Sequence, residues 1–209
     1  MKALLYKDLM CLWKNLRTYL LLCAGFQLLS IVNADGGFLR FYPTILVATI
    51  PNSLLAYEER DKWDKLSLTL PVSRKMLVTS KYLMGLILLG GITVLSAITG
   101  LIRDVNAPGS DLFGLGFELG WNLMLGMLIQ CIVLPATFRL GAEKGRLIYG
   151  ICLAAAAALF FIAVMAFMSL GIPEPEPGWL LNALILVPVL LMLPASWRLS
   201  VRFYEKREF

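Results

Sequence analysis

The sequence contains no histidine, the residue most often used to transfer protons and to bind metal ions. A Ser-His-Asp catalytic triad is therefore excluded in its usual form. A phosphate-binding loop of the form G-x-x-x-x-G-K-[ST] is also missing, because the nearest fragment, residues 141–145, has its glycines and lysine in the wrong order. We therefore expect this chain to carry no ATPase motif, no cofactor and no enzymatic activity of its own.

Charge and cysteine are also scarce. Charged residues make up 16% and hydrophobic residues 59% of the chain, whereas soluble domains have about 25% and about 45–50%. The four cysteines are widely spaced in or near apolar stretches, which favours small core side chains over disulfides or a metal site. This composition indicates a protein whose surroundings are a lipid bilayer. The cysteines are Cys11, Cys23, Cys131 and Cys152.

Six apolar stretches account for most of the chain, and most of them reach the roughly 20 residues that a helix needs to cross a bilayer. The first is short and contains Gln27. The stretches predict transmembrane spans over residues 18–33, 38–57, 82–102, 115–138, 147–170 and 179–197.

Basic residues gather on one side of these spans. Of the 19 Lys and Arg residues, only Arg40 and Arg103 fall on the other side. By the positive-inside rule the richer side is cytoplasmic. The sequence thus predicts an all-α membrane protein, a single transmembrane domain over residues 1–209, with six spans and both termini in the cytoplasm. We attribute the net charge of +5 to attraction by anionic membrane lipids and not to nucleic acid.

Residues 3–17 have the pattern of an amphipathic helix that lies in the cytoplasmic interface before the first span. The alternative is a cytoplasmic extension of that span. Lys7 and Lys14, a heptad apart, would lie opposite the apolar face. That face is predicted to contain Leu5, Leu9, Leu12, Trp13 and Leu16.

The predicted cytoplasmic loop 58–81 is the longest connection and the densest in charge. Both signs are interleaved, and Trp63, Leu66 and Leu70 supply apolar anchors among them, which is typical of a protein interface. One alternative is a solvated connector whose apolar residues pack back on the bundle. Another is that Trp63 anchors the loop at the lipid headgroups.

Polar residues and prolines inside the spans mark a candidate pathway for cargo. An acid within a membrane is a functional hypothesis by default, although Glu118 lies near the outer end of its span, where water reaches it. Prolines in the second span either bend it near a pathway or are accommodated without consequence. The candidate pathway residues are Gln27, Pro51, Glu118 and Gln130.

One local pattern carries a resemblance to a known family. Glu58-Glu59 precede the segment 70–74, Leu-Pro-Val-Ser-Arg, which is followed by Lys81-Tyr82 at the head of the third span. Together with the six-span pattern, this resembles the permease subunits of type-2 ATP-binding-cassette (ABC-2) exporters, in particular the small bacterial branch related to peptide and bacteriocin-resistance exporters. The short Pro-rich segment before the last span differs from the outer region of larger members.

The resemblance implies a permease of the bacterial cytoplasmic membrane that works as a homodimer or heterodimer. Cytoplasmic ABC ATPase subunits would bind ATP and Mg, and the cargo would be amphipathic peptides, antimicrobials or lipid-like molecules. A non-transporting membrane anchor or regulatory subunit, or an enzyme acting on lipid, is the alternative. The residues implied to couple the ATPase to the spans are Glu58, Glu59, Asp61, Trp63, Asp64, Leu66, Leu70, Pro71 and Arg74.

Overall fold

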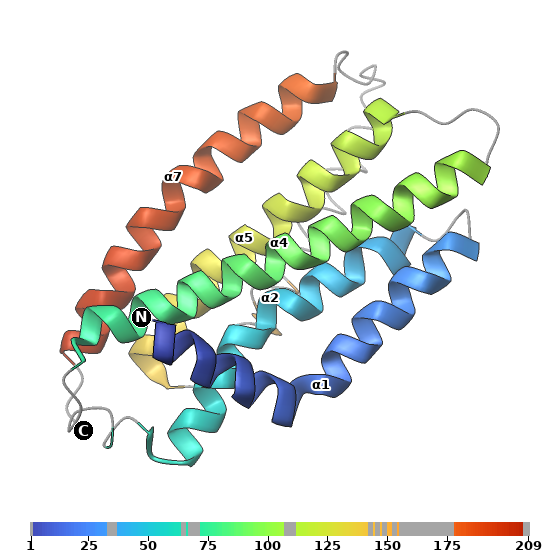
Figure 1. Ribbon diagram of the computed structural model, residues 1–209. Coiled ribbons are helices and arrows are strands. Elements are labelled where there is room, and N and C mark those ends of the chain that lie inside the picture. The colour runs from blue at the N-terminus through green and yellow to red at the C-terminus, as the bar shows by residue number, and fades with distance from the viewer. Residues whose placement is uncertain are drawn as a thin grey trace.

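The chain folds into a bundle of long α-helices (Figure 1). The computed structural model describes residues 2–32, 37–63, 66, 72–106, 112–141, 144, 147, 150–151, 154 and 178–206. Within these residues the structure is helical and has no strand, which confirms the predicted all-α class. The helices are α1 (Lys2–Val32), α2 (Gly37–Arg60), α4 (Arg74–Asn106), α5 (Leu112–Leu140) and α7 (Gly178–Glu205).

Three segments of the described residues are long and apolar enough to cross a membrane: Lys2–Val32, Arg74–Arg103 and Gly114–Leu140. Helices α2 and α7 contain the predicted spans 38–57 and 179–197. The predicted span 147–170 lies outside the described residues except at a few positions, so the number of six spans stays a prediction.

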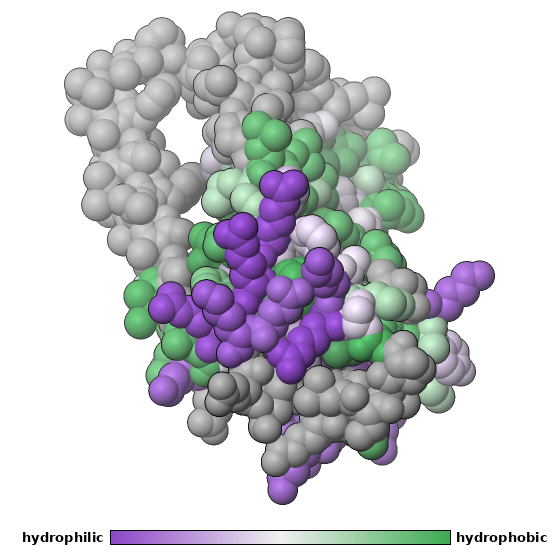
Figure 2. Space-filling view, turned by 90° about the vertical axis from the view of Figure 1, so that its left-hand side faces the viewer, coloured by the Kyte–Doolittle hydropathy of each residue, from purple (hydrophilic) through white to green (hydrophobic). Residues whose placement is uncertain are grey.

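The helices pack around α4 and α5. Helix α5 contacts α2, α4 and α7, while α1 packs against α2 and α4, and α4 also reaches α7. The start of α1 and the end of α7 lie at the same end of the bundle (Figure 1). The end of α2, the start of α4 and the end of α5 lie there too. Seen from the side, hydrophilic side chains gather towards this end, with hydrophobic ones beyond and beside them (Figure 2).

The helices extend further than the apolar stretches. Helix α4 begins at Arg74, about two turns before the predicted span, because Ser73 caps it: the Met76 backbone N–H donates to Ser73 Oγ at 3.3 Å. Its first turns also bury Leu77 and Val78 against the bundle. Since α2 continues to Arg60, both ends of the predicted loop 58–81 are helical, and the connection itself is shorter than predicted.

Residues 3–17 do not form a separate helix but the first part of α1, which then changes direction sharply (Figure 1). The predicted apolar face is divided in two. Leu12 and Leu16 are buried against the bundle, whereas Leu9 and Trp13 face outward. The buried stripe recurs every four residues and includes a charge, Asp8.

Glycines bring α4 and α5 close together at three levels. A Cβ atom built on Gly100 would lie 2.2 Å from Leu115 Cδ1, and one built on Gly126 would lie 2.5 Å from Leu89 Cδ2. A Cβ on Gly85 would lie 2.6 Å from Gln130 Nε2. Because glycine has no Cβ atom at these positions, the two helices can approach closely, as small residues allow in membrane bundles.

A proline within α5 is compensated by a neighbouring helix. Pro135 has no N–H, so it leaves the carbonyl of Cys131 without its helical partner. Ser196 of α7 donates its hydroxyl to that carbonyl at 2.7 Å, and the Tyr82 hydroxyl lies 2.6 Å from Ser196 Oγ. Freed backbone groups in a membrane need such partners. Helix α2 likewise runs without interruption through its prolines, Pro43 and Pro51.

Candidate functional site

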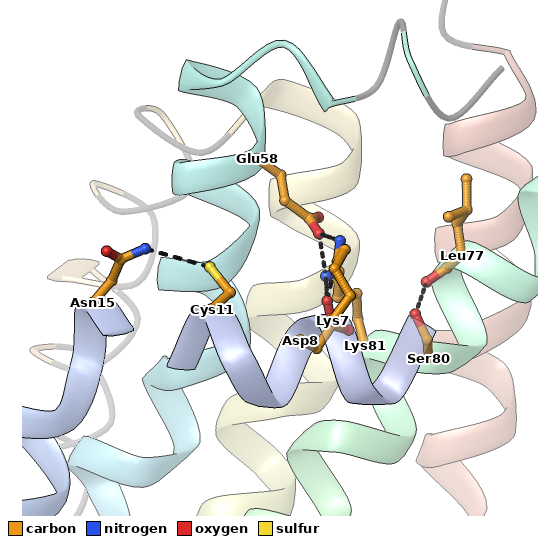
Figure 3. Close-up of polar contacts among 8 residues, drawn as sticks. All are labelled: Lys7, Asp8, Cys11, Asn15, Glu58, Leu77, Ser80 and Lys81. Atoms are coloured by element: carbon orange, nitrogen blue, oxygen red, sulfur yellow. Dashed lines mark hydrogen bonds and ion pairs between the residues drawn. The ribbon is translucent and has the colours of Figure 1, made fainter. Parts of the chain in front are cut away.

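Four charged side chains meet where α1, α2 and α4 converge (Figure 3). Lys81 of α4 donates to Asp8 Oδ1 of α1 and to Glu58 Oε1 of α2, both at 2.7 Å. Lys7 of α1 pairs with Glu58 as well, and its Nζ lies 3.2 Å from Asp8 Oδ1. We call Lys7, Asp8, Glu58 and Lys81 the ion cluster.

The ion cluster is buried. The exposed fraction is 3% for Lys81, 1% for Asp8 and 8% for Glu58, while Lys7 lies at the edge. The two positive and two negative charges of the ion cluster balance each other. This balance is needed because a buried charge without a counter-charge carries a large desolvation cost. Ion pairs here are screened little by salt.

Each member reaches the ion cluster because of its place on a helix. Asp8 lies on the buried stripe of α1, Glu58 in the last turns of α2, and Lys81 on the third turn of α4. Leu4, Leu55, Leu77 and Val78, near these charges in sequence, belong to one apolar core cluster. Glu58 and Lys81 therefore join the two helices on either side of the connecting loop, while Asp8 ties Lys81, and Lys7 ties Glu58, to α1.

Trp63, predicted to contact a partner, is half-buried and lies against Lys7 of the ion cluster. The Lys7 ammonium lies 4.2 Å from the centre of its ring, a cation–π contact. Just before it, Lys62 adopts a left-handed conformation with φ of 54° and ends α2. The turn thus brings Trp63 back towards the start of α1.

The other predicted coupling residues have different positions. Arg74 donates to the backbone carbonyls of Tyr204 (3.3 Å) and Glu205 (2.7 Å), and so caps the end of α7. Asp61 is exposed, Glu59 is half-buried and Leu66 is 55% exposed. Asp64, Leu70 and Pro71 lie outside the described residues. Glu58, which we expected to face a partner, is turned inward because two lysines balance its charge.

The candidate pathway residues lie on three helices, α1, α2 and α5. Gln27 is buried and joins α1 to α4, donating to Ser96 Oγ at 2.7 Å and accepting from Thr99 Oγ1 at 3.0 Å. Pro51 is buried within α2. Gln130 lies inside the bundle on α5.

Glu118 holds the opposite end of the bundle together. Arg40 of α2 donates to its Oε2 at 2.6 Å, and Arg103 of α4 lies 4.0 Å from the same atom. These are the two basic residues that the sequence assigned to the outer side. Glu118 therefore lies against both positive charges predicted there and neutralises one of them.

Of the four members of the ion cluster, only Glu58 was predicted as a site residue, and Lys7, Asp8 and Lys81 were missed. Asp8 carried a signal, because it is a lone acid at the spacing of the buried leucines Leu4 and Leu12. Lys81 was noted only as part of the Lys81-Tyr82 pair. Its partner Asp8 is 73 residues away, a distance over which sequence spacing indicates nothing.

Large apolar side chains face outward along these helices, Val32 at 82% and Leu21 at 71% exposure, while amides and ion pairs are buried inside. This is the reverse of a soluble protein and indicates a bilayer around the bundle. The structure is that of a multi-pass membrane protein.

The sequence profile described as ABC-2 family transporter protein matches residues 3–205. The chain therefore belongs to the ABC-2 family, whose members are the membrane-spanning subunits of ABC transporters and generally work with separate cytoplasmic ATPase subunits. The search of curated proteins gave no match.

Proposed function

We propose that this chain is the permease of an ATP-driven exporter in a bacterial cytoplasmic membrane, with six spans and both termini inside. Two permease units, identical or homologous, form the pathway. Separate ATPase subunits bind ATP and Mg and dock at the end of the bundle that holds the ion cluster. The cargo is amphipathic, within the range of peptides, antimicrobials and lipid-like molecules, as in the peptide and bacteriocin-resistance branch.

The observation that supports this proposal most is the ion cluster. A force on the loop after α2 acts at once on α1 and α4, because Glu58 pairs with Lys81 of α4 and with Lys7 of α1, and Lys81 also pairs with Asp8 of α1. Packed interiors transmit such displacements as rigid-body movements. The ion cluster therefore suits the coupling of ATPase closure to the spans.

The exposed part of the loop supplies the docking surface in this proposal. Asp61 and Leu66 face outward beside the inward-turned Trp63. Trp63 then has two roles in this proposal. Its ring makes the cation–π contact with Lys7, and the edge of the ring packs beneath the surface that the ATPase contacts. Aromatic side chains at interfaces often carry much of the affinity.

The test is to purify the chain together with the ATPase produced from its native neighbours and to measure ATP turnover. Glu58→Gln keeps the size of the side chain and removes its charge, and we expect the ATPase to stay bound but to lose stimulation by the permease. Glu205→Gln, an exposed acid at the end of α7, is the matched control. A folded chain that binds no ATPase would contradict the proposal and favour a membrane anchor.

A further inference from the structure

Among the described residues, two side-chain amides inside the bundle have no hydrogen-bond partner. Asn122 and Gln130, both on α5, are 1% exposed, and neither the nitrogen nor the oxygen of either amide is paired within the part of the chain that the structure describes. A buried amide without a partner has lost its bonds to water and gained nothing in return. Such groups are rare in native proteins, and each calls for an explanation.

The comparison with Gln27 shows that the bundle can satisfy an amide. Gln27 is buried as deeply, yet its Nε2 bonds Ser96 and its Oε1 bonds Thr99. The unpaired amides of α5 are therefore not a general property of polar groups in this interior. They are confined, among the described residues, to one helix.

The two amides share the inner side of α5. Glu118, Asn122, Gly126 and Gln130 recur every four residues, so they follow one side of the helix. At one end Glu118 pairs with α2 and α4, and at the other the Gln130 amide lies against Gly85 of α4. In between, Gly126 faces Leu89 of α4 and Thr44 of α2. This side is therefore directed towards α2 and α4.

We propose that Asn122 and Gln130 are a binding site for the backbone in the apolar, uncharged stretch of an amphipathic peptide, which reaches them when α5 separates from α2 and α4. This inference rests on the proposed transport function and specifies its cargo. A carboxamide both donates and accepts, as a peptide bond does. The two amides are eight positions apart, about 12 Å along the helix, which an extended backbone covers with three to four residues.

The charges near this side favour an uncharged stretch of the cargo. Glu118, one turn from Asn122, is paired with Arg40 and lies 4.0 Å from Arg103, so it offers no free carboxylate to a cationic ligand. A charged group brought to the amides would remain buried without a counter-charge. Backbone amides, in contrast, would satisfy all four unpaired atoms without altering the balance of charge.

The first measurement is thermal unfolding of the purified chain. Asn122→Leu and Gln130→Leu should raise the unfolding midpoint by a few degrees, because each removes an unpaired buried amide. Gln27→Leu, the matched control, should lower the midpoint, because it removes the hydrogen bonds of Gln27 with Ser96 and Thr99. A lower midpoint for both α5 variants would mean that their amides are already satisfied, and would overturn the proposal.

The second measurement is binding of an acetyl- and amide-capped tetraleucine by the chain, with and without its ATPase and ATP. A version N-methylated at every backbone nitrogen has no N–H to donate. The wild type should bind it about tenfold more weakly, the equivalent of roughly one net hydrogen bond. The double variant Asn122→Leu, Gln130→Leu should not distinguish the two peptides.

Equal binding of both peptides by the wild type, or a double variant that still distinguishes them, would overturn the site. Neither result affects ATPase binding or stimulation, which test the permease function separately. Conversely, a chain that recruits no ATPase but distinguishes the peptides would keep the site and contradict the transport function.

Discussion

Replacing Lys81 by methionine is the sharpest test of the ion cluster. Methionine nearly preserves the volume of the lysine stem, so the change removes mainly the charge and its two 2.7 Å contacts. Asp8 and Glu58 then share only Lys7, whose side chain is 28% exposed and already contacts both. Breaking a buried ion pair by removing one partner costs about 3–5 kcal/mol. We expect a loss of unfolding free energy in that range.

The second carboxylate oxygen of Asp8 supports the upper part of this range, because it is buried and has no partner within the described structure. Asp8 therefore depends on its other oxygen, which Lys81 and Lys7 share. The double variant Asp8→Asn, Lys81→Met should recover part of the loss, since it removes the charge that the single variant leaves unpaired. Coupling between contacting residues is typically about 0.5–3 kcal/mol.

The assay is denaturant-driven unfolding in detergent micelles, followed by the loss of helical circular dichroism. Lys75→Met is the control: it removes an exposed charge on the same helix and should change stability by less than about 0.5 kcal/mol. A cost for Lys81→Met below about 1 kcal/mol, the value of an ordinary surface pair, would refute the reasoning. The loss should also persist in high salt, which weakens only exposed pairs.

Three further predictions concern other parts of the structure. Gly126→Ala should destabilise the bundle by about 1–3 kcal/mol in the same assay, because its Cβ would lie 2.5 Å from Leu89, whereas Gly116→Ala, with no neighbour within 4 Å, should not. Lys62→Gly should stabilise by about 0.5–1 kcal/mol, since glycine adopts a φ of 54° without strain; an unchanged midpoint would contradict this. Trp63→Ala should weaken ATPase retention on purification by about 2 kcal/mol, more than Lys65→Ala, and equal retention would remove the loop from the interface.

The helical class and the positions of most helices could be predicted because hydropathy and basic residues are properties of single segments. Their ends could not, since they depend on tertiary contacts: α4 starts at Arg74 because Ser73 caps it and Leu77 packs inward. The prediction of a single apolar face on the first part of α1 was also wrong. A helix that contacts both protein and lipid has apolar residues on both sides, so the sequence pattern did not show which of them are buried.

For the candidate site, sequence identified residues but not their partners. Glu58, Trp63 and Arg74 were singled out as a group near the loop, yet each has an intramolecular contact that a partner was expected to supply. Gln130 was noticed because it is polar in an apolar span. Its lack of a hydrogen bond became visible only when the neighbouring helices were placed, and Asn122 was overlooked altogether.

The bend in α1 follows from its two attachments to α4. On α1 the attachments are 19 residues apart, from Asp8 to Gln27, whereas on α4 they are only 15 apart, from Lys81 to Ser96. At 1.5 Å per residue, α1 has about 6 Å more contour than the stretch of α4 beside it. Because both of its attachments are fixed to the shorter stretch of α4, the longer stretch of α1 has to bend between them. Any movement that releases the ion cluster therefore lets α1 straighten, and carries its first turns away from the bundle.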